Sequence, residues 1–255
     1  AIVKPKLYRW FIKSLATITI SGGWSMNWML SHNVSHHGYT NNIQDNDKFY
    51  HKLLRLSKHS ESLYIHQFQH IYAWFLYAIG LPITKLSLHI DSLEVLNHKL
   101  SFLDKLNHIL FKGLWYLLFV IYPVYKFSFQ KLYLFVFYQI LDSLYYVTLF
   151  TVNHNQIENE FVTYKTNDWA KHEIITSSNY FSGSKIANFL TGGLNHQIEH
   201  HIFPSYSHHT YPYIHTVLID ICKKENIPYH SYKTVFHAIY SHYIFLKNMG
   251  LHKKV

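Results

Sequence analysis

Two long apolar stretches, separated by a short polar break, dominate the hydrophobic pattern of the chain. Ile109 to Tyr125 is apolar apart from Lys112, and after residues 126–131 a second stretch runs from Leu132 to Val152. At about 1.5 Å per residue, a helix over the first stretch reaches roughly 25 Å, close to the thickness of the hydrocarbon core of a bilayer. The pattern predicts one transmembrane helical hairpin, with the Lys112 amine extended toward the membrane interface.

Two further apolar segments are less regular. Ile71 to Ile83 is short and broken by Gly80 and Pro82, and Leu15 to Leu30 is interrupted by polar residues and a glycine pair. Both are typical of segments that lie in the membrane interface rather than cross it. No Gly, Pro or Ser-rich linker divides the chain, so we expect residues 1–255 to form a single domain with an all-α, integral-membrane fold.

The composition supports a membrane location. Hydrophobic residues make up 49% of the chain and charged residues only 15%, compared with roughly 25% charged residues in soluble domains. The net charge of +9 comes from scattered lysines that favour an anionic lipid surface, whereas a nucleic-acid binder usually shows a dense basic stripe. The single cysteine, Cys222, excludes an intramolecular disulfide and a thiolate metal cluster. We therefore expect a membrane partner and no nucleic acid.

Two histidine clusters carry the candidate chemistry. Residues 32–37 read HNVSHH and residues 196–201 read HQIEHH. Neutral imidazole binds iron, copper, nickel and zinc well, and residues three or four apart on a helix share a face. If only the hairpin crosses the bilayer, both clusters and His154 lie on the same side of the membrane. The pattern therefore predicts a site for two metal ions.

Most of the 22 histidines are expected to have no such role. His66 and His70 also have helical spacing, but an isolated pair of this kind is weak support for a metal site. The others are expected at the surface or the membrane interface: His51, His59, His89, His98, His108 and His230.

Two longer motifs carry a family resemblance. His32 to Asn41 (HNVSHHGYTN) and Gly192 to Pro204 (GGLNHQIEHHIFP) resemble the second and third histidine boxes of the integral-membrane fatty acid desaturases. Gln197, in place of the first histidine of the third box, resembles the front-end group, which desaturates between an existing double bond and the carboxyl end. Weaker matches are residues 45–47, 69–72, 168–172 and 241–243, so the resemblance covers almost the whole chain.

The resemblance implies a non-haem di-iron centre in a histidine-rich cap facing the cytoplasm. It implies O2 as co-substrate, a cytochrome b5-type electron donor, and an acyl lipid or acyl-CoA substrate. The membrane would be the endoplasmic reticulum in a eukaryote or the inner membrane in a bacterium. The metal ligands that it implies are His32, His36, His37, His154, Gln197, His200 and His201.

Some neighbours of these ligands are open to more than one interpretation. His196 precedes His200 by four residues and competes with Gln197 as a ligand. The carboxylates that are candidates for orienting a ligand histidine, or alternatively for simple solvation, are Asp45, Asp47, Asp168 and Glu199.

Asp142 falls inside the second apolar stretch, where a charge is costly. We expect it to be protonated or to accept a hydrogen bond from one of three nearby tyrosines, Tyr138, Tyr145 or Tyr146. Alternatively, Asp142 lines an acyl tunnel.

One expected motif of the family has no counterpart. The first histidine box lies before the second in the family, but residues 1–31 contain no histidine. We expect the chain to be N-terminally truncated, and a chain without these two ligands to bind iron incompletely. The alternatives to a desaturase are an acyl hydroxylase or acetylenase on the same scaffold, and an inactive membrane protein that keeps its histidines as a relic. Acyl length, double-bond position and head group are not encoded in a readable motif.

Overall fold

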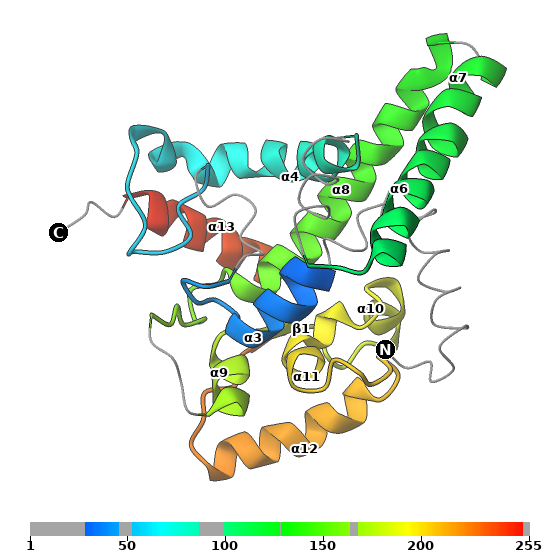
Figure 1. The fold of residues 1–255 in the computed structure, drawn as a ribbon. Coiled ribbons are helices and arrows are strands. Elements are labelled where there is room, and N and C mark those ends of the chain that lie inside the picture. The colour runs from blue at the N-terminus through cyan, green and yellow to red at the C-terminus, as the bar shows by residue number, and fades with distance from the viewer. Residues whose placement is uncertain (1–28, 46–52, 87–98, 128, 164–167, 252–255) are drawn as a thin grey trace. The chain divides into compact units, whose positions relative to one another are not determined.

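The computed structural model describes residues 29–45, 53–86, 99–127, 129–163 and 168–251, and their fold is mostly helical (Figure 1). The chain divides into two compact units. Unit 1 contains Ser35–Trp74 and Thr148–Val255, and unit 2 contains Val3–Val34 and Phe75–Val147. The expected interfacial segment Leu15 to Leu30 lies almost wholly outside the described residues.

Unit 2 contains the two long apolar helices. One runs from Phe102 to Phe127 as α6 (Phe102–Tyr116), a π-helical turn η3 (Leu117–Ile121) and α7 (Tyr122–Phe127). After the short η4 (Phe129–Lys131) the chain turns into α8 (Leu132–His154), of which unit 2 contains the part up to Val147. Among the described residues these two helices are long and apolar enough to cross a membrane, which agrees with the two stretches in the sequence.

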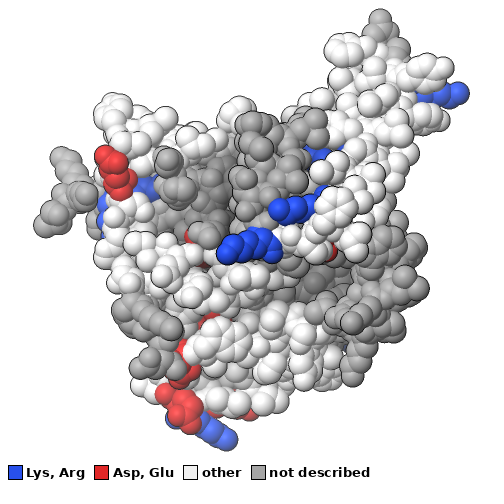
Figure 2. Space-filling model, in the orientation of Figure 1, with Lys and Arg blue, Asp and Glu red and all other residues white. Residues whose placement is uncertain are grey.

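The two helices lie side by side (Figure 1), and the rings of Trp115 and Phe135 are 6.3 Å apart. Their outer surface carries many exposed apolar side chains, among them Leu118, Ile121 and Phe137. In Figure 2 the surface of this hairpin is almost free of charged side chains, with positive charge near its tip. A continuous exposed apolar surface of this kind is typical of contact with lipid.

Three polar residues of unit 2 differ from the sequence-based expectation. Asp142 forms an ion pair with Lys85, at 2.6 Å between Nζ and Oδ2, instead of relying on the tyrosines. Lys112 does not extend outward: it is buried and donates a hydrogen bond to the Lys85 carbonyl at 2.9 Å. His108, expected at the surface or the membrane interface, is also buried. The cost of burying a lone charge explains the pairing.

The segment Ile71 to Ile83, expected to be broken, lies inside one continuous helix, α4 (Gln69–Leu86), which includes Pro82. In unit 2, the Ser143 hydroxyl accepts a hydrogen bond from the Leu81 N–H and donates one to the Tyr77 carbonyl. This hydroxyl bridges two groups that normally bond each other in a helix. Insertion of a side chain in this way lets the helix continue past the Gly and Pro positions.

Unit 1 gathers helices around the histidine-rich segments. The end of η1 (Met29–His36) leads into α3 (His37–Tyr39), and the C-terminal end of α8 belongs here as well. The other elements are η2 (Tyr64–Phe68), the start of α4, α9 (Trp169–Ile175), β1 (Asn179–Tyr180), α10 (Lys185–Leu190), η5 (Leu194–His196), α11 (Gln197–Ile202), α12 (Tyr211–Lys224), β2 (Ser231–Tyr232) and α13 (Val235–Leu251).

Two small apolar cores and a parallel strand pair hold this unit together. Leu149 and Val152 of α8 pack with Tyr180 and Ala238. A second core joins α9, α11 and α12 through Ile174, Ile198, Leu218 and Cys222. β1 pairs with β2 in parallel. These contacts fix α11, the helix of the second histidine cluster, between α9 and α12.

The turn before α11 depends on glycine. Gly193 has φ +90, in the left-handed region that side chains disfavour. A Cβ at this position would also lie 2.3 Å from Cβ of His208. Only glycine satisfies both conditions, so the glycine pair before the second cluster sets the start of α11.

Candidate metal centre

Three histidines from three segments of unit 1 converge. His36 comes from η1, His154 from the last turn of α8, and His201 from α11. Their ring centroids lie 4.6 to 4.9 Å apart, and the Nε2 atoms of His36 and His154 are 3.2 Å apart. All three are buried, and one coordinating atom from each lies within 4.8 Å of the others. This spacing suits a shared metal ion.

Acceptor oxygens face the outer nitrogen of each ring. Nδ1 of His36 is 3.0 Å from the Asp45 carboxylate, and Nδ1 of His201 is 2.7 Å from the Glu173 carboxylate. Nδ1 of His154 is 3.4 Å from the carbonyl of Thr176. When Nδ1–H of each ring donates a hydrogen bond to its acceptor, the Nε2 atoms keep their lone pairs, as a metal ligand requires.

His37 and His200 lie beside this group. The His37 ring stacks on His201 at 4.4 Å between centroids and is 4.8 Å from the His200 ring. Nδ1 of His200 is 3.2 Å from the Tyr211 hydroxyl. The structure therefore brings five of the expected histidine ligands together in unit 1.

The remaining expected ligands are His32 and Gln197. His32 is buried on η1, four residues before His36, and it belongs to unit 2. Gln197 reaches the cluster: its amide nitrogen lies 3.0 Å from Nε2 of both His154 and His201. Its oxygen accepts a hydrogen bond from Asn153 at 2.9 Å. In this orientation Gln197 acts as a donor that orients two histidines.

The carboxylates expected to orient ligand histidines differ in their positions. Asp45 contacts His36 as expected, and Asp47 lies outside the described residues. Asp168 instead caps the N-terminus of α9, where it accepts from the Lys171 N–H at 3.0 Å. An exposed Asp just before a helix favours this capping role.

Sequence reasoning missed Glu173, which is fully buried against His201. The available signal was its position directly after His172 in one of the weaker family motifs. Burial raises the pKa of Glu173 to about 8, although the Thr40 hydroxyl, 2.7 Å away, and the nearby His36 act in the opposite direction. A bound cation would lower this pKa and favour the carboxylate.

The donor set fits a metal with imidazole ligands. Burial, and then the neighbouring histidines, lower the pKa of His201 well below its usual value. A histidine with such a low pKa is neutral at physiological pH and offers a lone pair rather than a charge. Iron is among the metals that such nitrogen ligands bind.

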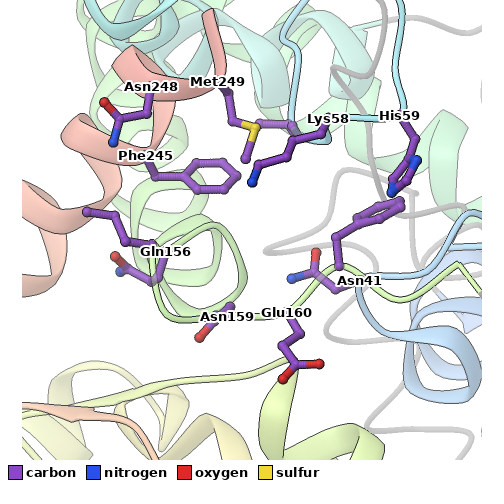
Figure 3. A pocket seen from close by; sticks show the side chains of 12 residues that line it. Asn41, Lys58, His59, Gln156, Asn159, Glu160, Phe245, Asn248 and Met249 are labelled. Atoms are coloured by element: carbon purple, nitrogen blue, oxygen red, sulfur yellow. The ribbon is translucent and has the colours of Figure 1, made fainter. Parts of the chain in front are cut away.

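A pocket of about 400 Å³ opens elsewhere in unit 1 (Figure 3). Lys58 and His59 lie on one side of it, Phe245 and Met249 of α13 on another, and Glu160 at its base. The expected metal ligands do not line it. The pocket is therefore separate from the histidine cluster.

Comparison with known proteins identifies the family. A profile of the fatty acid desaturase family matches residues 2–233. The chain belongs to the fatty acid desaturase family. The histidine cluster lies within the matched region, as expected for a desaturase. No solved structure matches the chain.

The similar curated proteins are front-end desaturases. The chloroplastic acyl-lipid (7-3)-desaturase of Chlamydomonas reinhardtii is 30% identical over 92% of this chain and 49% of its own length. The sn-1 linoleoyl-lipid 6-desaturase of Arthrospira platensis is 28% identical over 88% of this chain and 64% of its own. The acyl-lipid (8-3)-desaturase of Physcomitrium patens is 27% identical, over 92% and 52%. The chain thus spans about half to two thirds of the length of these relatives.

Proposed function

We propose that the protein is a front-end fatty acid desaturase that inserts a double bond into an already unsaturated acyl chain. The observation that carries this proposal is the convergence of His36, His154 and His201, each with an acceptor behind its ring, in a chain of the desaturase family. The names of the relatives described above specify acyl lipids, which supports an acyl lipid as the substrate. Acyl-CoA is the alternative that the resemblance implies.

Two non-haem irons, when bound, would supply the chemistry by which O2 and two electrons remove two hydrogens from an unactivated acyl chain. His36, His154 and His201 would hold one of them, and His37 and His200 would contribute to the other. His32, which belongs to unit 2, stays a proposed ligand because the family motif implies it. A cytochrome b5-type protein would deliver the electrons.

The residues around the cluster would keep the ligands in place. Asp45 and Glu173 hold the protons on Nδ1 of His36 and His201, so that Nε2 stays free of a proton. Gln197 is kept as a candidate ligand because its amide adjoins two ligand nitrogens. Ligation would require its oxygen, which accepts from Asn153 in this structure, to turn toward the metal. The burial of His36, His154 and His201 keeps water away from the metal that they would hold.

We further propose that residues 1–255 form one domain whose α6–α7 and α8 helices cross the membrane as a hairpin. The histidine cluster would form a cap on the cytoplasmic side. The apolar exposed surface of the two helices supports this arrangement. In a eukaryote the membrane would be that of the endoplasmic reticulum, and in a bacterium the inner membrane.

Product analysis tests the function. The full-length protein is expressed in a yeast host with its electron donor and fed linoleic acid, and the fatty acids are analysed by gas chromatography and mass spectrometry. We expect the new double bond between the carboxyl group and the existing bonds, with stearate a poor substrate. Conversion of stearate to oleate would contradict the front-end assignment, and a hydroxylated or acetylenic product would contradict desaturation.

Ligand variants complete this test. His200→Ala should abolish the product while the protein is still made, and the exposed His209→Ala serves as the matched control. Gln197→Ala should lose most activity and Gln197→His should keep some. An active His200→Ala enzyme would overturn the ligand assignment.

A further inference from the structure

A second group of metal-ligating side chains lies in unit 1, next to the cluster described above but not part of it. It contains His196 of η5, Glu199 of α11 and His215 of α12. On the helix, Glu199 is about 200° around the axis from Gln197, so it points away from the first cluster. Nδ1 of His196 is 3.6 Å from one Glu199 oxygen, and Nδ1 of His215 is 3.2 Å from the other.

His196 is the unusual member of this group. Its side chain is completely buried, and neither ring nitrogen has a hydrogen-bond partner among the described residues. Burial of an unsatisfied polar group costs about 1–3 kcal/mol. Such a group in a native protein usually marks a water or an ion.

We propose that His196, Glu199 and His215 bind a divalent transition-metal ion of the zinc class. At zinc–ligand distances of about 2.0–2.1 Å, the ligand atoms of a tetrahedral site lie roughly 3.3 Å apart. The separations of 3.2 and 3.6 Å run to different oxygens of Glu199. One ligand atom from each of the three residues lies within 4.8 Å of the others, so small side-chain movements would bring them to the spacing of a tetrahedral site. Two histidines and one glutamate are a ligand set that zinc accepts, with the fourth position left to a water or another oxygen.

The surrounding residues orient this set. The Asn179 amide donates to Glu199 at 2.7 Å, and its oxygen accepts from the Ile198 N–H at 2.9 Å. The Tyr229 hydroxyl hydrogen-bonds to Glu199 and lies 2.7 Å from Nδ1 of His215. Tyr229 is therefore placed to occupy or support the fourth position. Partners of this kind, which fix the ligands from behind, are typical of metal sites.

A hydrogen-bond network without a metal is the competing explanation. Asn179, Tyr229 and His215 already satisfy Glu199 in such a network. It gives His196 only the long 3.6 Å approach of Nδ1 to Glu199 and leaves its Nε2 without a hydrogen-bond partner among the described residues, so a phenylalanine would then serve nearly as well in the same space. The two explanations predict opposite results for His196→Phe.

The site would join α11 to α12. His196 directly precedes Gln197, and Glu199 directly precedes His200. A metal bound here would therefore brace the segment that carries the second histidine cluster. Its role is structural, and it does not depend on the proposed reaction.

Metal analysis of the full-length protein tests the proposal. The protein is purified from membranes, equilibrated with Zn²⁺, dialysed, and analysed for zinc and iron per chain by mass spectrometry. We expect about one zinc per chain, with an X-ray absorption spectrum of nitrogen and oxygen ligands. His196→Phe and His215→Gln should weaken zinc binding about tenfold or more. The exposed His209→Phe is the control.

Iron and zinc contents of a variant in the first cluster separate this site from that cluster. His201→Ala should lose iron and keep zinc, which holds the two proposals apart. Wild-type protein without zinc, or a His196→Phe variant that keeps it, would overturn the proposal. The zinc content of the wild type tests the proposal by itself, so the proposal can be overturned even if a variant does not fold.

Discussion

Glu173 and His201 form a fully buried pair, with 2.7 Å between Oε2 and Nδ1. Glu173 comes from α9 and His201 from α11, so the pair also links two helices that pack through Ile174 and Ile198. The carboxylate fixes which nitrogen of His201 faces the other histidines. This arrangement makes Glu173 a residue that positions His201 in the candidate metal centre.

The first prediction follows from this pair. Glu173→Gln should lower the affinity of the protein for iron by about 10–100-fold, because a neutral amide orients the imidazole less strongly than a carboxylate. Iron per chain, measured against a graded concentration of chelator, checks the effect. Glu225→Gln, an exposed residue after α12, is the control. Equal iron retention in Glu173→Gln and wild type would show that Glu173 has only a packing role.

The second prediction concerns the turn before α11. Gly193→Ala should destabilise the protein by about 1–3 kcal/mol, since the backbone there is left-handed and a Cβ would collide with His208. Gly183→Ala has open space around its Cβ and is the matched control. Thermal unfolding in detergent should show a lower Tm for Gly193→Ala alone. A similar Tm for both variants would mean that the turn relaxes freely.

The third prediction concerns the ion pair in unit 2. Removing one partner, in Lys85→Met or Asp142→Leu, should cost about 3–5 kcal/mol because the other charge is left buried. The double variant should recover much of this loss. Thermal stability of the four proteins in a double-mutant cycle gives the coupling free energy. Additive losses would show that the two charges are stabilised separately.

The sequence was sufficient for the parts of the structure that depend on local pattern. Long apolar runs predicted the helices Phe102–Phe127 and Leu132–His154. The repeated histidine pattern indicated that histidines of the two clusters and His154 can meet, and His36, His154 and His201 do lie together. The Lys85–Asp142 pair could not be predicted in this way, since its members are far apart in the chain and meet only when α4 and α8 pack.

The same limit applies around the candidate site. Asp168 begins the family motif at residues 168–172 and Glu173 comes directly after it. The sequence alone therefore does not decide which of the two carboxylates contacts a ligand histidine. Only the packing of α9 decides that Asp168 caps the helix while Glu173 points inward to His201. Hydrogen bonding to a helix end is local, but the choice of a buried carboxylate depends on tertiary contacts.

The fourth prediction concerns the membrane hairpin. In a Cys222→Ser background, a cysteine in place of Lys131, between the two long helices, should react with an impermeant thiol reagent from the side opposite the histidine cluster. A cysteine in place of the exposed Ser205, just after α11, should react only from the other side. Both reactions are read on intact and permeabilised vesicles. Labelling of both positions from one side would contradict the hairpin.

The last prediction concerns the pH dependence of stability. His242 of α13 is completely buried, its Nδ1 donates to the Asn155 carbonyl at 2.7 Å, and burial lowers its pKa to about 4. In the unfolded chain its pKa is about 6.5. The folded state therefore binds fewer protons than the unfolded state between these two values, and stability falls as the pH drops from about 6.5 to about 4.

The size of this effect follows from the shift in pKa. At about 1.36 kcal/mol per pKa unit, His242 contributes a loss of roughly 3 kcal/mol over this range. His242→Gln keeps a donor for Asn155 but does not titrate, so it should lose less stability on acidification than the wild type. The exposed His237→Gln is the matched control and should behave like the wild type. Tm values at pH 7 and pH 4.5 give the comparison, and an acid-induced drop of equal size in wild type and His242→Gln would show that other groups cause the acid sensitivity.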